Sequence, residues 1–295
     1  MKRILRIAAA LGLGSALACA SAEQPNSAAQ QELEAAFEAA KLVRKVGPVD
    51  IPLGGQATMH LPAGFVFVPG AESVRILKAM GNRPGSDTLG LVFPGEDGNW
   101  FAHARFVKSG YIKDDDAKEW KADEMLDQLK EGTEKSNADR RARGIPEVQI
   151  VGWVEKPTYD AGTHRLVWSV ESTAKGAASS RENGINYNTY LLGREGYVSL
   201  NFVTDMSTIA DEKPIAKKLL ASVEFDKDKS YADFNSSTDH IAEYGLAALV
   251  GGVAAKKLGL FALIAAFAAK FIKVIALGAV AVGTAFVKLF RRKSA

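Results

Sequence analysis

Hydrophobic and polar residues follow two different periods along the middle of the chain. Apolar residues three or four positions apart predict helices, and short β-branched or aromatic runs between turn residues predict strands. The helical period covers residues 27–45, 72–80, 116–143 and 214–220. Two or three short strands are predicted within 47–69, and further strands over 88–93, 100–107, 147–157, 163–172, 185–192, 197–204 and 222–225.

Four of these predicted strands follow one another between residues 147 and 204. Their connections are short and carry Gly, Asn or Asp, which favours antiparallel pairing as a meander. Helices precede and follow this block. The pattern therefore predicts an α+β fold, a sandwich in which helices cover an antiparallel sheet.

The start of the long predicted helix carries three consecutive acids, Asp114, Asp115 and Asp116. Such a group could supply oxygen ligands to Ca²⁺ or Mg²⁺, but consecutive carboxylates point in different directions. Asp116 followed by Glu119 has the spacing of a capping box at a helix N-terminus. We interpret the acids as helix caps rather than as a metal site.

The N-terminus has the three parts of a secretory signal, predicted here over residues 1–22. Basic residues at positions 2, 3 and 6 precede an apolar run to Ala18, and Ala20 to Ala22 form an A-x-A cleavage site. Cleavage before Glu23 would remove Cys19, the only cysteine, and with it disulfide and thiolate chemistry. The alternative is a lipoprotein modified at Cys19, although Ala16 stands where such signals usually carry Leu.

The C-terminus from Gly245 onward is apolar but interrupted by lysines. Its apolar blocks cover 245–255, 258–269 and 274–287, and none reaches the roughly 20 residues that span a bilayer as a helix. A single crossing near 271–290 is preferred, because Lys273 and Lys288 would then lie at its edges. An amphipathic helix in the membrane plane and a two-span hairpin bent at Lys270 to Lys273 are the alternatives.

Charge is distributed unevenly between the body and this tail. Residues 23–244 carry 26 Lys and Arg against 34 Asp and Glu, whereas the tail carries eight basic residues and no acid. The distribution argues against nucleic-acid binding and suits contact with anionic lipid. We expect an inner-membrane protein with N-terminus outside and C-terminus inside, organised as helix 23–46, periplasmic α+β domain 47–226, linker 227–244 and membrane anchor 245–295.

Small residues recur every four positions at Gly251, Ala255 and Gly259. This small-xxx-small spacing lets helices approach closely in a membrane. It predicts self-association as one partner choice, beside the lipid bilayer and an envelope protein.

The histidines give little catalytic signal, because no two of the four are close in sequence and no H-E-x-x-H, G-x-S-x-G or P-loop motif occurs. His103 alternates with Phe101 and Arg105, so we interpret it as a structural strand residue. His164 near Asp160 could form part of an acid–base pair, but its position in a turn argues against this. Together with Asp115 it defines a hydrolase hypothesis, which requires the three side chains to converge.

Aromatic residues are concentrated in the predicted meander. They could line a ligand groove, but aromatic residues in strands more often form the sheet core, and we favour the core. These residues are Trp153, Tyr159, Trp168, Tyr187, Tyr190 and Tyr197.

Several separate motifs, in one order, carry a resemblance to a known family. They are Leu61 to Phe65, Gly81-Asn82, Gly110 to Ala117, Gly152 to Asp160, Asn186-Tyr187, Leu192 to Gly196, and the tail from Gly251 to Lys257. The chain resembles the bacterial membrane-anchored proteins known as domain of unknown function 2167. This resemblance implies an envelope location and membrane anchoring, and it supplies no activity. More loosely, Leu61 to Phe65 and the stretch Pro214 to Phe225 are similar to sandwich domains of the PsbP and Mog1 kind, a likeness of fold only.

The expected function is therefore a non-enzymatic binding or scaffold role for an ectodomain at the membrane. No catalytic residue, cofactor or metal ligand is assigned from the sequence. The alternatives are an envelope hydrolase using Asp and His residues, and an oligomerising, membrane-perturbing element centred on the tail.

Overall fold

The computed structural model describes residues 28–251 except 81, 97, 143–145, 178–179 and 181. The predicted signal peptide, its cleavage sites and the tail from residue 252 lie outside the described residues. The helices are α2 (Ala28–Val43), α3 (Gly70–Ala79), α4 (Ala122–Ala142), α5 (Ile209–Ala221) and α6 (Ala248–Gly251), with 3₁₀ turns η1 (Asp115–Glu119) and η2 (Tyr231–Asp233). The strands are β1 (Lys45–Val46), β2 (Val49–Leu53), β3 (Ala57–Leu61), β4 (Phe65–Pro69), β5 (Thr88–Pro94), β6 (Phe101–Val107), β7 (Val148–Asp160), β8 (Arg165–Ala174), β9 (Gly184–Leu192), β10 (Tyr197–Asp205) and β11 (Val223–Phe225).

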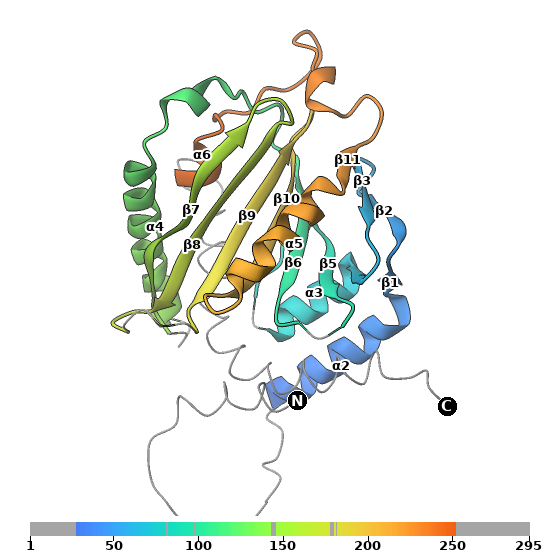
Figure 1. The fold of residues 1–295 in the computed structure, drawn as a ribbon, viewed down its shortest axis with the longest axis vertical. Coiled ribbons are helices and arrows are strands. Elements are labelled where there is room, and N and C mark those ends of the chain that lie inside the picture. The colour runs from blue at the N-terminus through green and yellow to red at the C-terminus, as the bar shows by residue number, and fades with distance from the viewer. Residues whose placement is uncertain are drawn as a thin grey trace, which may run out of the picture.

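The strands form a large and a small antiparallel sheet. The large sheet has eight strands in the order β1-β4-β5-β6-β10-β9-β8-β7, and the small sheet has the order β11-β3-β2. Strands β7 to β10 pair with their chain neighbours, so the predicted meander is confirmed. The predicted α+β class, with helices over an antiparallel sheet, is confirmed as well (Figure 1).

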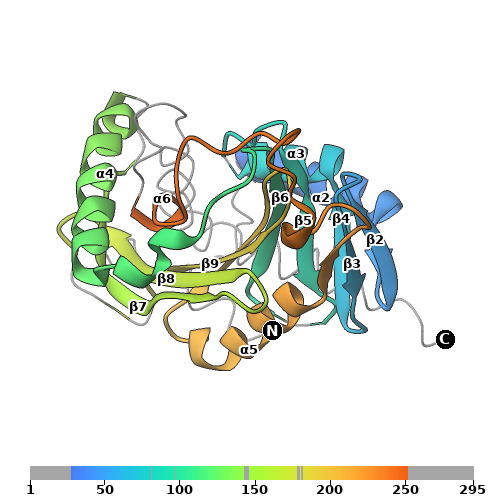
Figure 2. The ribbon, with the colours of Figure 1, turned by 90° about the horizontal axis from the view of Figure 1, so that it is seen from above.

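One face of the large sheet is covered by α5 and the small sheet (Figure 2). Trp100, which precedes β6, and Phe202 of β10 stack here with ring centroids 4.6 Å apart. Leu53 and Met59 from the small sheet and Leu219 from α5 complete an apolar core whose side chains are almost fully buried. Because this face is closed by regular elements, strand alternation alone predicts which residues point toward it.

The opposite face carries two apolar clusters. Helices α2 and α3 cover one end, where Phe37 of α2 packs edge to face on Phe93 of β5. Helix α4, α6 and the segments beside them cover the other end, where Trp168 of β8 is fully buried. On the same face His103 of β6 pairs across the strands with Asn201 of β10, and both are buried.

The long helix begins later than predicted. Residues 115–119 form a 3₁₀ turn, Trp120 is extended, and α4 starts at Ala122. Asp116 lies inside the 3₁₀ turn, where its carboxylate accepts a hydrogen bond at 2.9 Å from the N–H of Ala247. The capping interpretation of Asp116 and Glu119 is therefore wrong, because the Asp116 carboxylate binds a segment distant in sequence.

Helix α5 begins five residues before Pro214, which was predicted to open it. The chain turns helical at Ile209 after Thr208, and the N–H of Glu212 donates to the carbonyl of Thr208 at 3.0 Å. The Thr208 hydroxyl also donates to the Glu212 carboxylate at 2.9 Å. These contacts start the helix, and Pro214 lies inside it with no N–H to donate.

The predicted linker, residues 227–244, is part of the fold. Its η2 turn is closed by a capping box between Ser230 and Asp233. The Tyr231 hydroxyl donates to the carbonyl of Ile112 at 2.8 Å, and Tyr111 pairs with Ile241 as an isolated parallel bridge.

The first residues of the predicted anchor also pack on the domain. Leu246, Leu249 and Val250 are buried in the cluster beside α4. Gly251 is buried too, and a Cβ placed on it would lie 2.3 Å from the Gln128 side chain of α4. Gly251 thus contacts α4 of the same chain, while Ala255 and Gly259 lie outside the described residues.

Candidate functional site

Four segments from distant parts of the sequence meet at one end of the large sheet. Residues 108–116 follow β6, residues 161–164 join β7 to β8, and residues 193–196 join β9 to β10. The segment after β11, drawn in orange along the top of Figure 1, crosses this end. Its Lys229 carbonyl accepts from the N–H of Arg194 at 2.9 Å, and the Glu195 carbonyl accepts from the N–H of Gly110 at 3.0 Å.

Two glycines allow these segments to approach so closely. Gly196 has φ 155°, and a Cβ on it would lie 2.0 Å from the carbonyl oxygen of Val107. Gly110 has φ 87°, and its Cβ would lie 2.6 Å from the His240 ring. Because any side chain would clash at both positions, these turns require glycine.

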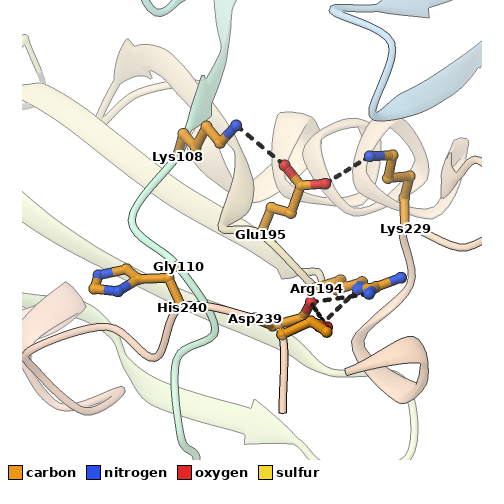
Figure 3. Close-up of a pocket in the computed structure, with 8 residues that line it drawn as sticks. Lys108, Gly110, Arg194, Glu195, Lys229, Asp239 and His240 are labelled. Carbon is orange, nitrogen blue, oxygen red and sulfur yellow. Dashed lines mark hydrogen bonds and ion pairs between the residues drawn. The ribbon is translucent and has the colours of Figure 1, made fainter. Parts of the chain in front are cut away.

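A cavity of about 560 Å³ opens between these segments. Figure 3 shows the side chains of Lys108, Glu195 and Lys229 along one side of it. Arg194, Asp239 and His240 lie along the other side. The complete lining is Lys108, Gly110, Arg194, Glu195, Lys229, Thr238, Asp239 and His240.

Arg194 and Asp239 form a bidentate ion pair in this cavity. Arg194 Nε donates to Oδ2 of Asp239 at 2.6 Å, and Nη2 donates to Oδ1 at 2.9 Å. The same carboxylate accepts from the N–H of Asn235 at 2.7 Å and from the Thr238 hydroxyl at 2.9 Å. The Arg194 hydrogen bonds, followed by that of Asn235, hold the pKa of Asp239 well below its ordinary value.

Glu195 lies between two lysines. Its carboxylate oxygens are 2.5 Å from Lys229 Nζ and 3.3 Å from Lys108 Nζ. The hydrogen bond from Lys229 is the main cause that lowers the pKa of Glu195. Both cavity acids therefore stay ionised at neutral pH, and neither is suited to hold a proton for transfer.

A second polar group lies next to the cavity. The Tyr159 hydroxyl donates to Oδ2 of Asp114 at 2.7 Å and is 3.1 Å from Nδ1 of His164. The His164 ring packs on Tyr231 with centroids 4.1 Å apart, and Tyr231 stacks on Tyr111 at 4.3 Å. Burial, and then the hydrogen bond to Asp114, raises the pKa of Tyr159 above its ordinary value.

The residues of the hydrolase hypothesis do not converge. The Asp160 carboxylate accepts from the N–H of Gly162 at 2.9 Å and from the Thr163 hydroxyl at 2.7 Å, so it holds the β7–β8 turn. His164 faces Asp114, whose carboxylate lies 3.9 Å away, instead of Asp115 or Asp160. The alternative of an Asp160–His164 pair is therefore wrong, because turn hydrogen bonds hold the acid.

The three consecutive acids also diverge. Asp114 accepts from Tyr159, Asp116 accepts from the backbone of Ala247, and Asp115 is exposed. Within residues 28–251, as far as they are described, no group of three His, Cys, Asp or Glu side chains could hold a metal ion.

The other sequence interpretations of single residues are confirmed. His103 is a buried strand residue, 5% exposed, with Nε2 at 3.2 Å from the Thr88 hydroxyl. Four of the six meander aromatics are core residues, namely Trp168, Tyr187, Tyr190 and Tyr197. Trp153 donates to the carbonyl of Ala122 at 3.1 Å and so joins β7 to α4.

Sequence reasoning missed the charged side chains of the cavity. Arg194 and Glu195 were included only in a short connection of the meander and in the motif Leu192 to Gly196, and Asp239 was placed in a linker. The available signal was weak: two opposite charges stand side by side in a tight turn between the predicted strands 185–192 and 197–204, which carry no charged residue. Their partners come from segments more than 30 residues away, so no local pattern shows the pairing.

With this geometry established, comparison with known proteins identifies the family. The model of a family described as protein of unknown function (DUF2167) matches residues 45–283. The chain belongs to this family. No curated protein matches it.

Solved structures with a similar fold include cyanobacterial PsbP (CyanoP) from Synechocystis, at 8% identity and a TM-score of 0.36. That match covers 62% of this chain and 91% of the other. The Ran-binding protein Mog1p from Saccharomyces cerevisiae matches at 11% identity and a TM-score of 0.30, covering 61% of this chain and 96% of the other. At these values the likeness concerns the fold and gives no information on function.

Several of the family motifs lie close together in the fold. Three of the motifs that carry the family resemblance reach the cavity end of the sheet, namely Gly110 to Ala117, Gly152 to Asp160 and Leu192 to Gly196.

Among the residues that the structure describes, no helix is long and apolar enough to cross a membrane.

Proposed function

We propose that this chain is an envelope protein whose periplasmic domain binds a ligand or partner in the cavity at the sheet end, without catalysing a reaction. The C-terminal segment anchors it to the inner membrane, with the N-terminus outside and the C-terminus inside. A single crossing is preferred over an in-plane helix, for the lysine positions given above.

The observation that carries this proposal is the cavity lined by paired charges. Its volume of about 560 Å³ falls within the range of about 300 to 1,000 Å³ usual for small-molecule sites. The two acids that line it are ionised and held by Arg194 and the lysines. Such a surface offers charge and hydrogen bonds for recognition, and neither of its two acids is suited to hold a proton for transfer.

The position of the cavity relative to the tail supports an anchored binding domain. The chain runs from the cavity lining at His240 to the buried residues 246–250 within a few positions. The tail therefore leaves from the folded domain itself, with no flexible spacer between residue 240 and residue 251.

The membrane topology is tested by labelling single cysteines in the full chain. Lys135 is 72% exposed on α4, and Lys135→Cys reports on the domain, whereas Ala295→Cys reports on the C-terminus. A membrane-impermeant maleimide should label position 135 once the outer membrane is permeabilised, and position 295 only after the inner membrane is broken. Labelling of both positions at once, or of position 295 alone, would rule out the proposed N-out crossing.

Binding at the cavity is tested by photo-crosslinking in cells. A photoreactive residue replaces Lys108, which lines the cavity and is 75% exposed, or, as the matched control, Lys135. A light-dependent adduct of defined mass is expected at position 108 and not at position 135. Identical results at the two positions would mean that the cavity holds no specific occupant.

One observation supports an envelope hydrolase as a second candidate. The Tyr159 hydroxyl bridges Asp114 and His164, a set different from the predicted Asp115, Asp160 and His164. His164→Gln should leave the photo-crosslink at position 108 intact if the protein only binds. If cells carrying His164→Gln behave like cells that lack the protein, although the adduct at position 108 still forms, the hydrolase is favoured.

A further inference from the structure

We propose that the cavity binds a phosphate group through Lys108, Lys229 and Arg194. This inference rests on the proposed function and gives the chemical class of the ligand. It rests on one difference: the acids of the cavity already accept hydrogen bonds, whereas the basic side chains still have N–H groups to donate.

The acids of the cavity have little capacity left to bind a cation or a donor. The Asp239 carboxylate accepts four hydrogen bonds, two from Arg194 and one each from Asn235 and Thr238. The Glu195 carboxylate faces an ammonium group at each oxygen. Asp233, a further acid near Arg194, accepts from the N–H and the hydroxyl of Ser230.

The basic side chains of the cavity, in contrast, have more N–H donors than hydrogen-bond partners within the described residues. Each lysine ammonium has three N–H donors, and Lys108 and Lys229 each have one carboxylate partner, Glu195. Arg194 has five donors, of which three are used on Asp239 and on the carbonyl of Asp228. An anion that enters the cavity would accept hydrogen bonds from the remaining N–H donors, while Arg194 stays paired with Asp239.

The charge balance points the same way. Three basic residues and two acids line the cavity, whereas residues 23–244 as a whole carry eight more acids than bases. The cavity is therefore a local site of positive charge on a negatively charged body. Such a site attracts anions, because the paired lysines and the guanidinium act at short range where the net charge of the body is screened.

The geometry suits an oxyanion rather than a halide. Lys108 and Lys229 approach Glu195 from two sides, and Arg194 presents its planar group on the opposite side of the cavity (Figure 3). Several donors from different directions match the three or more oxygens of a phosphate. The source of that phosphate is either an anionic lipid headgroup or a soluble compound.

The test uses the full-length protein in lipid nanodiscs and inorganic phosphate as the probe. In discs of phosphatidylcholine, titration calorimetry should detect phosphate binding by the wild type. Lys108→Gln should weaken it about tenfold, the effect of losing one charge-assisted hydrogen bond worth about 1.4 kcal/mol. Lys135→Gln is the matched control, because Lys135 is equally exposed and also paired with a glutamate, and it should leave binding unchanged.

A second set of discs separates the two sources. If added phosphatidylglycerol weakens phosphate binding by the wild type, the headgroup occupies the cavity; if it does not, the ligand is soluble. Both results support the anion site. Absence of phosphate binding, or equal loss in Lys108→Gln and Lys135→Gln, would overturn it. The photo-crosslink at position 108 could still be present in that case, which would leave the binding function standing with a different ligand class.

Discussion

The two faces of the large sheet are closed in different ways. The face under α5 and the small sheet is covered by regular elements, and its core consists of interlocking apolar side chains. Near β7 to β10 the other face is covered by α4 and by the irregular segments 108–121 and 226–251. There, polar groups bind backbone atoms of distant segments, as Tyr231 does with Ile112 and Asp116 with Ala247.

The difference explains where the cavity lies. Regular elements pack their side chains without gaps, because ridges and alternating residues interdigitate. Irregular segments meet through hydrogen bonds and ion pairs, which fix the backbone but leave space between the chains. The 560 Å³ cavity lies where these segments cross the sheet end. Stability should therefore depend mainly on the first face, and binding on the second.

The largest effect is expected on the apolar face. Phe202 is 1% exposed and stacks on Trp100, so Phe202→Ala should lower the free energy of unfolding by about 3 to 5 kcal/mol through lost burial and the cavity left behind. Urea denaturation of the full-length protein measures it. Leu42→Ala, at a side chain 87% exposed, should change almost nothing, and a similar loss in both variants would contradict the comparison.

On the other face, the largest loss is expected where one polar side chain joins two elements. Asn137 of α4 is fully buried; its Nδ2 donates to the carbonyl of Val148 at 2.9 Å, and its Oδ1 accepts from the N–H of Val148 at 3.0 Å. Asn137→Ala should cost about 1 to 3 kcal/mol in urea denaturation, because two buried backbone groups lose their partner. If Asn137→Ala lowers the free energy of unfolding less than the adjacent variant Ser136→Ala does, the two hydrogen bonds to Val148 contribute nothing to stability.

His103 should make the free energy of unfolding change by about 2 kcal/mol with pH. Burial, and then the nearby Arg105, lowers its pKa to about 3, below the ordinary 6.5. The unfolded chain therefore binds a proton that the folded protein does not, so this stability is present above pH 6.5 and is lost as the pH falls toward 3. Between pH 7 and pH 5 the loss should reach about 2 kcal/mol.

The measurement for His103 is urea denaturation of the wild type and of His103→Gln at both pH values. The variant should show the smaller decrease on going to pH 5, because the glutamine does not titrate. Parallel decreases in the two proteins would mean that His103 is protonated in the folded state.

The smallest effect is expected at Tyr231. Tyr231→Phe keeps the ring stacked on Tyr111 and removes the hydroxyl that donates to the carbonyl of Ile112, so the free energy of unfolding should fall by about 1 kcal/mol. Hydrogen exchange should at the same time become faster for the amides of residues 226–244 and not for those of β9. Unchanged exchange in that segment would show that other contacts hold it.

The sequence predicted the strands of the large sheet better than the segments that cross its end. Alternating strands and amphipathic helices leave a local signal, which is why β7 to β10 were placed within a few residues. Asp116 was misread as a helix cap, because a carboxylate before a helical pattern has the same signature whether it binds the next turn or a distant N–H. The sequence also left open a pair of Asp160 with His164, whereas Gly162 and Thr163 provide the hydrogen bonds to this carboxylate.

By itself the sequence determined the family, the α+β class, the meander and the contrast between an acidic body and a basic apolar tail. The family follows from its resemblance in several short motifs, and the other three follow from composition and from periods of two and 3.6 residues, which are local properties of the chain. Only the tertiary structure decided that 227–251 belongs to the fold and that Arg194, Glu195 and Asp239 share a cavity with Lys108 and Lys229. The reason is physical: ion pairs between segments far apart in sequence depend on how loops cross the sheet, and loop paths leave no periodic trace.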